Sequence, residues 1–150
     1  MFLVKDSSPL REQRILAILK EDASLSLLLS VIHFEWTIRR AIIVLGTSPN
    51  VEIRQKLKDE RGGLDGYKKV WKDEVFLRVN KRLTEVITDW DNLKKAFKLR
   101  NALVHGISSC GQDYAIEKAN CVIEASRIIR KLSSDYGFDL DTRLPVRRKK

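Results

Sequence analysis

The chain has 150 residues, of which 43% are hydrophobic, and its 29 Lys and Arg residues against 20 Asp and Glu give a formal net charge of +9. This length suits one domain, which would bury roughly two-thirds of the surface that the unfolded chain exposes. The apolar runs are shorter than the roughly 18 to 20 residues of a membrane span, and the first one breaks after four residues. We therefore expect a soluble, cytoplasmic protein without a membrane segment or a secretory leader.

The side chains that hold metals are scarce. Cys110 and Cys121 stand at a spacing that fits no zinc pattern, and the two histidines of the chain do not complete one. The acidic pairs occur in helical contexts without a second group of ligands, and there is no Gly-rich loop of the phosphate-binding kind. The sequence predicts reduced cysteines, no metal and no cofactor.

The positive charge favours a polyanionic partner such as nucleic acid. Part of it belongs to the terminal "RRKK", and removing these four positive charges from +9 leaves +5. We expect residues 145–150 to form a basic, disordered tail and residues 1–144 to form a single domain. The remaining excess gathers in "NLKKAFKLR", residues 92–100.

Only three prolines and seven glycines are present, and strand-like alternation is rare, so the composition predicts an all-α fold. A first helix is predicted to start at Ser7, Ser8 and Pro9. A long second helix is predicted over Ser24 to Leu45, closing at Gly46.

The remaining helices are predicted from similar capping and stop residues. The third is expected to have Ser48 as its N-cap, with Pro49 at the first position, and to end at "RGG", residues 61–63. The fourth is expected from Asp65 through "YKKVWKDEVFLRVNKRL", residues 67–83. Asp89 caps the next, which ends at Gly106, and the last runs from near Tyr114 to Ser134 with a stop at Gly137. These signals predict a compact bundle of five to six helices.

The segment "FKLRNALVHG", residues 97–106, places an arginine inside an apolar stripe. On a helical wheel Arg100 lies at the centre of an arc formed by Trp90, Leu93, Ala96, Phe97, Leu103 and Val104. Asn101 and His105 are four residues apart and share one edge of this arc, which Lys94 and Lys98 continue. The pattern predicts an inward guanidinium with an amide and an imidazole beside it.

The second helix carries a matching charge within its apolar face. Its arc consists of Leu28, Val31, Ile32, Ile38, Ile42 and Ile43, and Glu35 lies inside it with Arg39 one turn later. Since an unpaired buried charge costs about 3 to 5 kcal/mol, we expect Glu35 to pair with Arg39, Arg100 or both. His33 falls on the polar side with Ser26, Ser30, Thr37 and Arg40, and we expect it to face solvent or an interface.

"RNALVHG", residues 100–106, resembles the R-x-x-x-x-H signature of the HEPN superfamily, whose common form has Asn or Asp directly after the arginine. "HFEWTIRRAIIVLG", residues 33–46, is similar to the long first core helix of small bacterial HEPN proteins. The resemblance implies an all-α, HEPN-like bundle and a metal-independent endoribonuclease, acting as a toxin or in defence against phage. It also implies a homodimer, because the arginine and histidine of two subunits meet at one composite site.

The resemblance also implies roles for individual residues. His105 would transfer protons, Arg100 would stabilise the charge on the phosphorane, and Asn101 would orient the imidazole or bind a phosphate oxygen. The supporting residues would be Glu35 and Arg39, and the RNA-binding residues would be Lys94, Lys98 and Arg40. RNA, a second copy and a cognate antitoxin are the implied partners.

Two observations leave alternatives open. HEPN toxins paired with a nucleotidyltransferase antitoxin carry a tyrosine two residues after the histidine, where this chain has Ile107, so that mode of control is not implied. His105 before Gly106 also suits a helix cap, with Arg100 and Glu35 as a structural ion pair. The second function hypothesis is therefore a non-catalytic HEPN-type dimer that binds nucleic acid or a protein partner.

Overall fold

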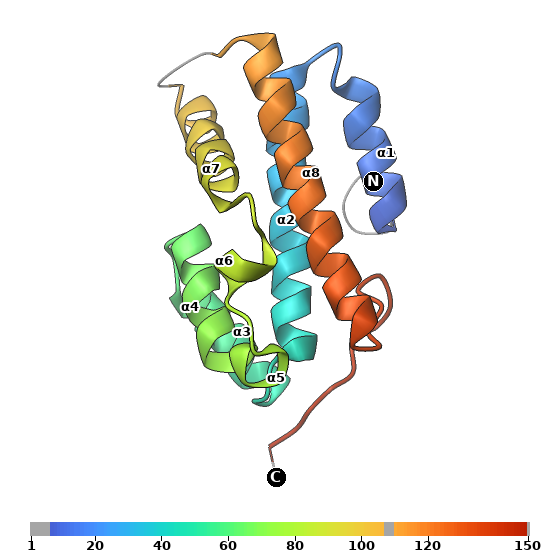
Figure 1. Ribbon diagram of the computed structural model, residues 1–150, viewed down its shortest axis with the longest axis vertical. Helices are drawn as coiled ribbons and strands as arrows, with labels where there is room; N and C mark the ends of the chain where they lie inside the picture. The colour runs from blue at the N-terminus through green and yellow to red at the C-terminus, as the bar shows by residue number, and fades with distance from the viewer. Residues whose placement is uncertain (1–6, 107–109, 150) are drawn as a thin grey trace. The chain divides into compact units, whose positions relative to one another are not determined.

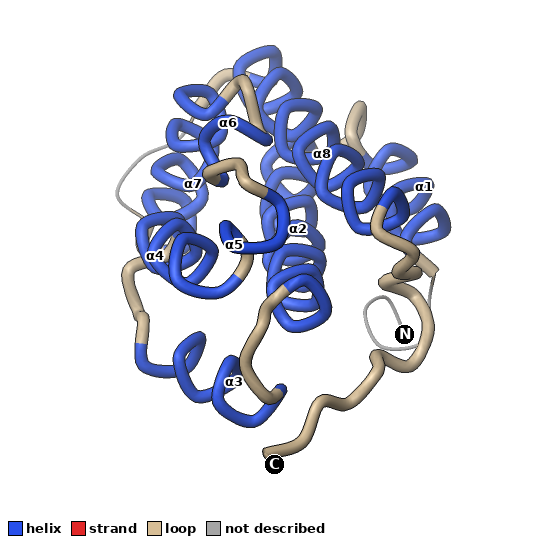
Figure 2. Tube along the Cα trace, turned by 60° about the horizontal axis from the view of Figure 1, so that its bottom comes forward, coloured by secondary structure: helices blue, strands red, loops and turns tan. Residues whose placement is uncertain are grey.

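The computed structural model describes residues 7–106 and 110–149, and within these ranges all regular structure is helical (Figure 2). The helices are α1 (Ser8–Ile18), α2 (Ala23–Leu45), α3 (Asn50–Asp59), α4 (Leu64–Glu74), α5 (Phe76–Val79), α6 (Leu83–Val86), α7 (Trp90–Val104) and α8 (Gln112–Asp135). The predicted all-α class is confirmed. None of the helices among these residues is long and apolar enough to cross a membrane.

The structure has more helices than the five or six expected, because the predicted fourth helix is divided into α4 and α5, and the short helix α6 follows where none was predicted. α4 ends at Glu74, α5 has four residues, and Asn80 then adopts a left-handed conformation with φ 55° that ends α5. Asparagine tolerates this conformation better than most residues, and one such residue stops a helix. α6 begins only after Arg82.

Apart from the division of the fourth helix, most predicted helix ends lie close to the observed ones, although the start of α3 differs and Asp89 precedes α7 without a side-chain cap bond. The Ser7 side chain accepts a hydrogen bond from the Leu10 amide at the start of α1, and Gly106 and Gly137 have φ values of 66° and 85° after α7 and α8. Ser48, the expected N-cap of α3, instead donates its hydroxyl to Glu74 over 2.5 Å, and the helix begins at Asn50.

The described residues group into two compact units, where the sequence predicted one domain. Unit 1 comprises residues 1–35 and 89–127, and unit 2 comprises residues 36–88 and 128–150. α2 and α8 are continuous helices that each contribute residues to both units.

Unit 1 is built from α1, the first part of α2, α7 and most of α8 (Figure 1). Ser26 donates to the Ile15 carbonyl over 2.8 Å, which joins α2 to α1. Phe34 of α2 meets Phe97 of α7 edge to face, with ring centroids 5.8 Å apart. α2 is therefore flanked by α1 and by α7 within this unit.

The polar side of α2, on which His33 was expected to face solvent or an interface, is buried within the chain, and the prediction for His33 is wrong. Ser26, Ser30, His33 and Thr37 have no exposed surface. The reason is that α1 covers this face and supplies partners, because Arg11 Nε donates to His33 Nδ1 over 3.1 Å. Conversely Ile32, expected inside, is 38% exposed.

Unit 2 is built from the second part of α2, the helices α3 to α6, the end of α8 and the C-terminal segment (Figure 2). Trp71 of α4 is fully buried, as expected of a core tryptophan, and its indole Nε1 donates to the Lys81 carbonyl over 2.9 Å. Buried aromatic rings of this size contribute strongly to a core, and the indole N–H finds an acceptor as burial requires.

The basic C-terminal segment lies against unit 2, which differs from the disordered tail expected from its composition. Asn50 exchanges hydrogen bonds with this segment, donating to the Pro145 carbonyl over 2.9 Å and accepting from the Arg147 amide over 3.0 Å. The Arg147 guanidinium donates to the carbonyls of Ile43, Val44 and Ser48. Composition could not reveal this, because the docking depends on carbonyls left free where α2 ends.

Candidate functional site

The candidate site of unit 1 lies on the last turns of α7. The buried residues of this helix are Leu93, Ala96, Phe97 and Leu99. Arg100 points in the predicted direction, but its side chain is 24% exposed, and Val104, expected inside, is 60% exposed. A helical wheel predicts the direction in which a side chain points. It does not predict whether a neighbouring helix is long enough to cover that side chain. The last turn of α7 is covered less than the turns before it.

Arg100 contacts an acidic and an aromatic side chain. Its Nη1 lies 3.6 Å from Glu35 Oε2 of α2, and its guanidinium carbon lies 5.4 Å from the centre of the Phe97 ring. The buried Nε of Arg100 has no hydrogen-bond partner among the described residues. The expected pairing of Glu35 with Arg100 is therefore present, as a long contact that leaves donors of the guanidinium available.

The Glu35–Arg100 pair is not the fully buried pair that the wheel suggested. The Glu35 side chain is 26% exposed, close to the value for Arg100. Ion pairs in partial contact with water contribute up to about 1 kcal/mol, well below the cost of breaking a buried pair. The pair orients the guanidinium more than it stabilises the fold.

His105 forms the C-cap of α7 and is exposed. Its backbone has φ −89° and ψ 2°, and its amide donates to the Asn101 carbonyl over 3.1 Å. This region of backbone space is sparsely populated and is common among active-site residues. Asn101 is also exposed, so an amide and an imidazole reach solvent at the end of the helix that holds Arg100.

The four other residues predicted for the site divide between the units. Lys94 and Lys98 are both exposed on α7. They are four residues apart and therefore lie on the same face of the helix. In unit 2, Arg39 Nε donates to the Tyr67 hydroxyl over 3.1 Å, and Arg40 donates to the carbonyls of Leu140 and Thr142.

Arg40 is held in a partly buried place. Its guanidinium carbon lies 4.6 Å from the centre of the Trp36 ring, and burial lowers the pKa of Arg40. A guanidinium engaged by two carbonyls and a ring has few donors left for a phosphate. The structure thus shows Arg40 engaged within unit 2, and the RNA contact predicted for it stays a prediction.

Two exposed apolar side chains flank the Glu35–Arg100 pair, and the sequence reading placed both inside the protein. Ile32 precedes Glu35 by three residues on α2, and Val104 follows Arg100 by four on α7. Residues at these spacings share a helix face, so each member of the pair has an exposed apolar side chain one turn away on its own helix. Exposed apolar side chains that lie near one another are typical of a surface that another molecule covers.

A second polar cluster of unit 1 was missed by sequence reasoning. Glu12 of α1 lies with its Oε1 3.8 Å from His33 Nε2, and its Oε2 accepts a hydrogen bond from Arg127 Nε of α8 over 3.1 Å. Arg11, which donates to the other ring nitrogen of His33, is almost fully buried. The sequence indicates this cluster only weakly, through the adjacent opposite charges of Arg11 and Glu12 in a helix that packs on apolar residues.

No family model, curated protein or solved structure matches the chain. The HEPN resemblance therefore depends on the motif at residues 100–106 and on the surroundings of Arg100. Ile107, at the place of the tyrosine of some HEPN toxins, lies outside the described residues. Within residues 7–106 and 110–149 no three His, Cys, Asp or Glu side chains are grouped so as to hold a metal ion.

Proposed function

We propose that the protein is a metal-independent endoribonuclease of the HEPN type. The observation that carries the proposal is the Arg100 guanidinium, which Glu35 holds at a partly exposed edge of unit 1 and which has hydrogen-bond donors to spare. Asn101 and His105 are exposed on the following turn of the same helix. A core arginine kept only for stability would be expected to satisfy its buried donors within the protein.

The proposed reaction is attack of a ribose 2′-hydroxyl on the adjacent phosphate, with departure of the 5′-oxygen. Histidine is the side chain that exchanges protons most readily near neutral pH, so the imidazole of His105 can accept the hydroxyl proton or protonate the leaving oxygen. Arg100 donates hydrogen bonds to the charge that grows on the phosphorane oxygens. Asn101 binds a phosphate oxygen or orients the imidazole.

One His105 per chain does not supply both an acid and a base, so the proposed site needs a second copy. A twofold axis would bring two sets of Arg100, Asn101 and His105 together. The exposed Ile32 and Val104 beside the Glu35–Arg100 pair support an interface at this place. The same interface would exclude water from the reacting phosphate.

Lys94 and Lys98 would bind the RNA backbone through its phosphates. An activity of this kind suits a toxin or a phage-defence enzyme in the cytoplasm, with a cognate antitoxin as a further partner. The second candidate is a non-catalytic HEPN-type dimer that binds nucleic acid or a protein partner. The observation in its favour is that His105 also serves as the C-cap of α7.

The test is cleavage of a single-stranded RNA by the full chain in the presence of EDTA, resolved on a denaturing gel. We expect products with 2′,3′-cyclic phosphate or 3′-phosphate ends, and a loss of at least about 100-fold in rate for His105→Ala, the usual minimum for a general acid or base. Asp91→Asn is the matched control, because Asp91 is exposed in the first turn of the same helix.

Two results would contradict the proposal. Cleavage that disappears in EDTA and returns only with magnesium or manganese would point to a metal-dependent nuclease. RNA binding without cleavage by the wild-type chain, unchanged in His105→Ala, would favour the non-catalytic dimer.

A further inference from the structure

A pocket of about 340 Å³ lies in unit 2, between α4 and α6, and the proposed ribonuclease does not use it. Four basic side chains line it, namely Lys68, Lys69, Lys72 and Arg82, together with the carboxylate of Asp65. Its volume is at the lower end of the range for small-molecule sites, about 300 to 1,000 Å³. The pocket therefore suits a small ligand.

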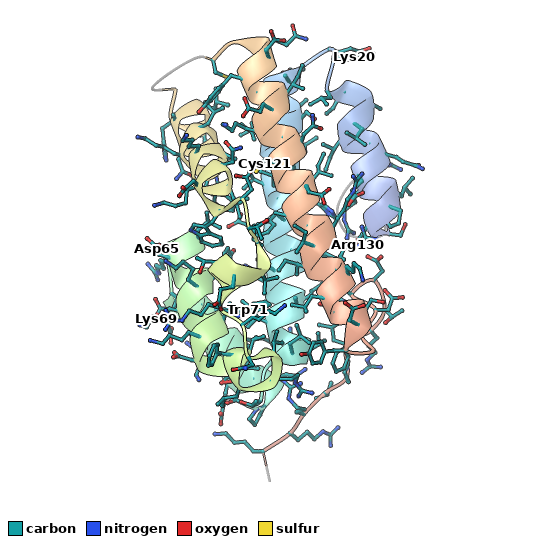
Figure 3. All side chains as sticks on the ribbon, viewed as in Figure 1. Lys20, Asp65, Lys69, Trp71, Cys121 and Arg130 are labelled. Atoms are coloured by element: carbon teal, nitrogen blue, oxygen red, sulfur yellow. The ribbon has the colours of Figure 1, made fainter. Side chains whose placement is uncertain are left out.

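Asp65, Lys68, Lys69 and Lys72 line the α4 side of the pocket from one face of this helix, and Figure 3 labels Asp65 and Lys69 on it. Asp65, Lys68 and Lys72 follow one another at spacings of three and four residues, which places them in a row. Seven residues at a rise of 1.5 Å separate the two ends of this row by about 10 Å. The carboxylate is at one end and a lysine is at the other.

The second wall of the pocket comes from the segment that enters α6. The buried Trp71 holds this segment against α4, because its Nε1 donates to the Lys81 carbonyl over 2.9 Å. Arg82 directly follows Lys81 and also lines the pocket. Thr84, from the first turn of α6, adds a hydroxyl to the lining.

The charge of the pocket is strongly positive. The lining has four basic side chains and one carboxylate, an excess of three positive charges. One of these charges is neutralised from outside the lining, because Lys69 Nζ lies 2.5 Å from Glu60 Oε1. Lys72 is exposed and has no ion-pair partner in the described parts of the chain. Two positive charges thus remain for a ligand, on Lys72 of α4 and on Arg82 directly before α6, and such a pair of donors suits a tetrahedral anion such as phosphate.

Asp65 restricts the ligand further. An ionised carboxylate only accepts hydrogen bonds, so it repels a bare anion and favours a ligand that carries hydroxyl groups besides its anionic group. We propose that the pocket binds a small phosphorylated polyol of the sugar-phosphate class, with its phosphate at Lys72 and Arg82 and its hydroxyls at Asp65 and Thr84. This site is independent of the proposed ribonuclease.

The test is isothermal titration of the full chain at low ionic strength with ribose 5-phosphate, ribose and inorganic phosphate. We expect ribose 5-phosphate to bind at least tenfold more tightly than inorganic phosphate, and ribose to show no binding. Lys72→Gln should weaken both phosphate-containing probes at least tenfold. Asp65→Asn should weaken ribose 5-phosphate, because the amide offers one acceptor oxygen to the hydroxyls in place of the two of the carboxylate, and should not weaken inorganic phosphate, which only loses a repulsive charge.

Lys58→Gln is the matched control, since Lys58 is exposed on α3 of the same unit and lies outside the pocket. Equal effects of Lys58→Gln and Lys72→Gln would overturn the proposal, because they would show attraction by general charge. Arg82→Gln provides a second probe of the phosphate end, and circular dichroism verifies the fold of each variant.

Three further outcomes separate the alternatives. An absence of ribose 5-phosphate binding overturns the proposal. If it is accompanied by Lys72-dependent binding of an RNA oligonucleotide, the pocket belongs to a nucleic-acid surface. Asp65→Asn tightening both probes equally would overturn the polyol assignment. Retention of RNA cleavage by Lys72→Gln would show that the pocket and the ribonuclease site are separate, so that either proposal can fail alone.

Discussion

At the scale of single residues, the chemistry proposed for unit 1 depends on the direction in which one guanidinium points. Arg100 has a carboxylate at 3.6 Å and an aromatic ring at 5.4 Å, and both contacts come from side chains of the same unit. An arginine oriented in this way has its donors fixed before a substrate arrives. Fixed donors stabilise a developing charge without a cost for reorganisation during the reaction.

Glu35→Gln should change stability little and cleavage strongly. The pair is partly exposed, so we expect the free energy of unfolding to fall by no more than about 1 kcal/mol. The loss of the charge that orients Arg100 should lower the single-turnover cleavage rate more than it lowers RNA affinity, because a misplaced arginine affects the transition state most. Thermal melts, RNA titrations and single-turnover cleavage measure the three quantities.

The control for this variant is Glu124→Gln, which removes an exposed carboxylate of unit 1 that lies 3.8 Å from Arg127. It should leave both stability and cleavage near wild type. A Glu35→Gln protein that cleaves RNA as fast as wild type would show that Arg100 needs no orientation by Glu35.

The sequence predicted the Glu35–Arg100 contact but misplaced His33, and the two cases differ physically. A charge on an apolar helix face needs an opposite charge or water as its partner. The helical wheel puts Glu35 and Arg100 on such faces, so their pairing could be predicted. The row Ser26, Ser30, His33 and Thr37 has the spacing of a solvent-facing side, yet all four are buried. The serine hydroxyls at positions 26 and 30 donate to backbone carbonyls, which sequence spacing does not reveal.

At the scale of elements, one buried carboxylate joins three parts of unit 2. Glu74 at the end of α4 is 1% exposed, and its oxygens accept hydrogen bonds from the Ser48 amide at 2.9 Å, the Ser48 hydroxyl at 2.5 Å and Lys56 Nζ at 2.8 Å. Burial alone would raise the pKa of Glu74, but the hydrogen bonds from Lys56 and Ser48 outweigh it and lower this pKa to about 2. Glu74 thus holds the turn between α2 and α3 against α4.

This lowered pKa makes the free energy of unfolding depend on pH. The pKa of Glu74 is lower in the folded chain than its ordinary value of 4.5, so its contribution is complete above about pH 5 and is lost as the pH falls towards 2. The contribution is on the order of 2 to 3 kcal/mol. Urea unfolding from pH 7 to pH 3 should show this loss for the wild type and a smaller one for Glu74→Gln.

Glu74→Gln should also be less stable than wild type at pH 7. Glu60→Gln is the control, because Glu60 forms its ion pair with Lys69 near the surface at the other end of α4. Parallel acid profiles for the wild type and Glu74→Gln would mean that Glu74 does not hold the turn through its charge.

Most helix ends could be predicted because the signals are local. Gly46 follows α2 as expected, and the structure adds a reason of packing, since a Cβ there would lie 2.7 Å from the Ile42 carbonyl oxygen and 2.4 Å from Ile53 Cδ1. The division between α4 and α6 could not be predicted, because it depends on Trp71 drawing the Lys81 carbonyl inward. The apolar stripe of residues 67–83 continues across this break.

At the scale of the whole molecule, the net charge of +9 overstates the charge that a polyanion can reach. Arg40 and Arg147 donate to backbone carbonyls of unit 2, and burial lowers the pKa of each. The sequence alone does not reveal this, because composition counts cations and not their partners. The exposed Lys94 and Lys98 lie on α7, the helix that carries Arg100, Asn101 and His105 of the proposed ribonuclease site.

The proposed composite site also requires a homodimer, which we expect to form through the face of unit 1 that carries Ile32 and Val104. Val104→Asp should convert the dimer to a monomer at micromolar concentration, because it buries a charge in an apolar interface, and should reduce cleavage in proportion. Val51→Asp is the matched control, since Val51 is 76% exposed on α3 of unit 2 and Val104 is 60% exposed. Size-exclusion chromatography with light scattering measures the mass of each variant.

A wild-type chain that is monomeric yet cleaves RNA would contradict the composite site. A monomeric Val51→Asp variant together with a dimeric Val104→Asp variant would place the interface in unit 2.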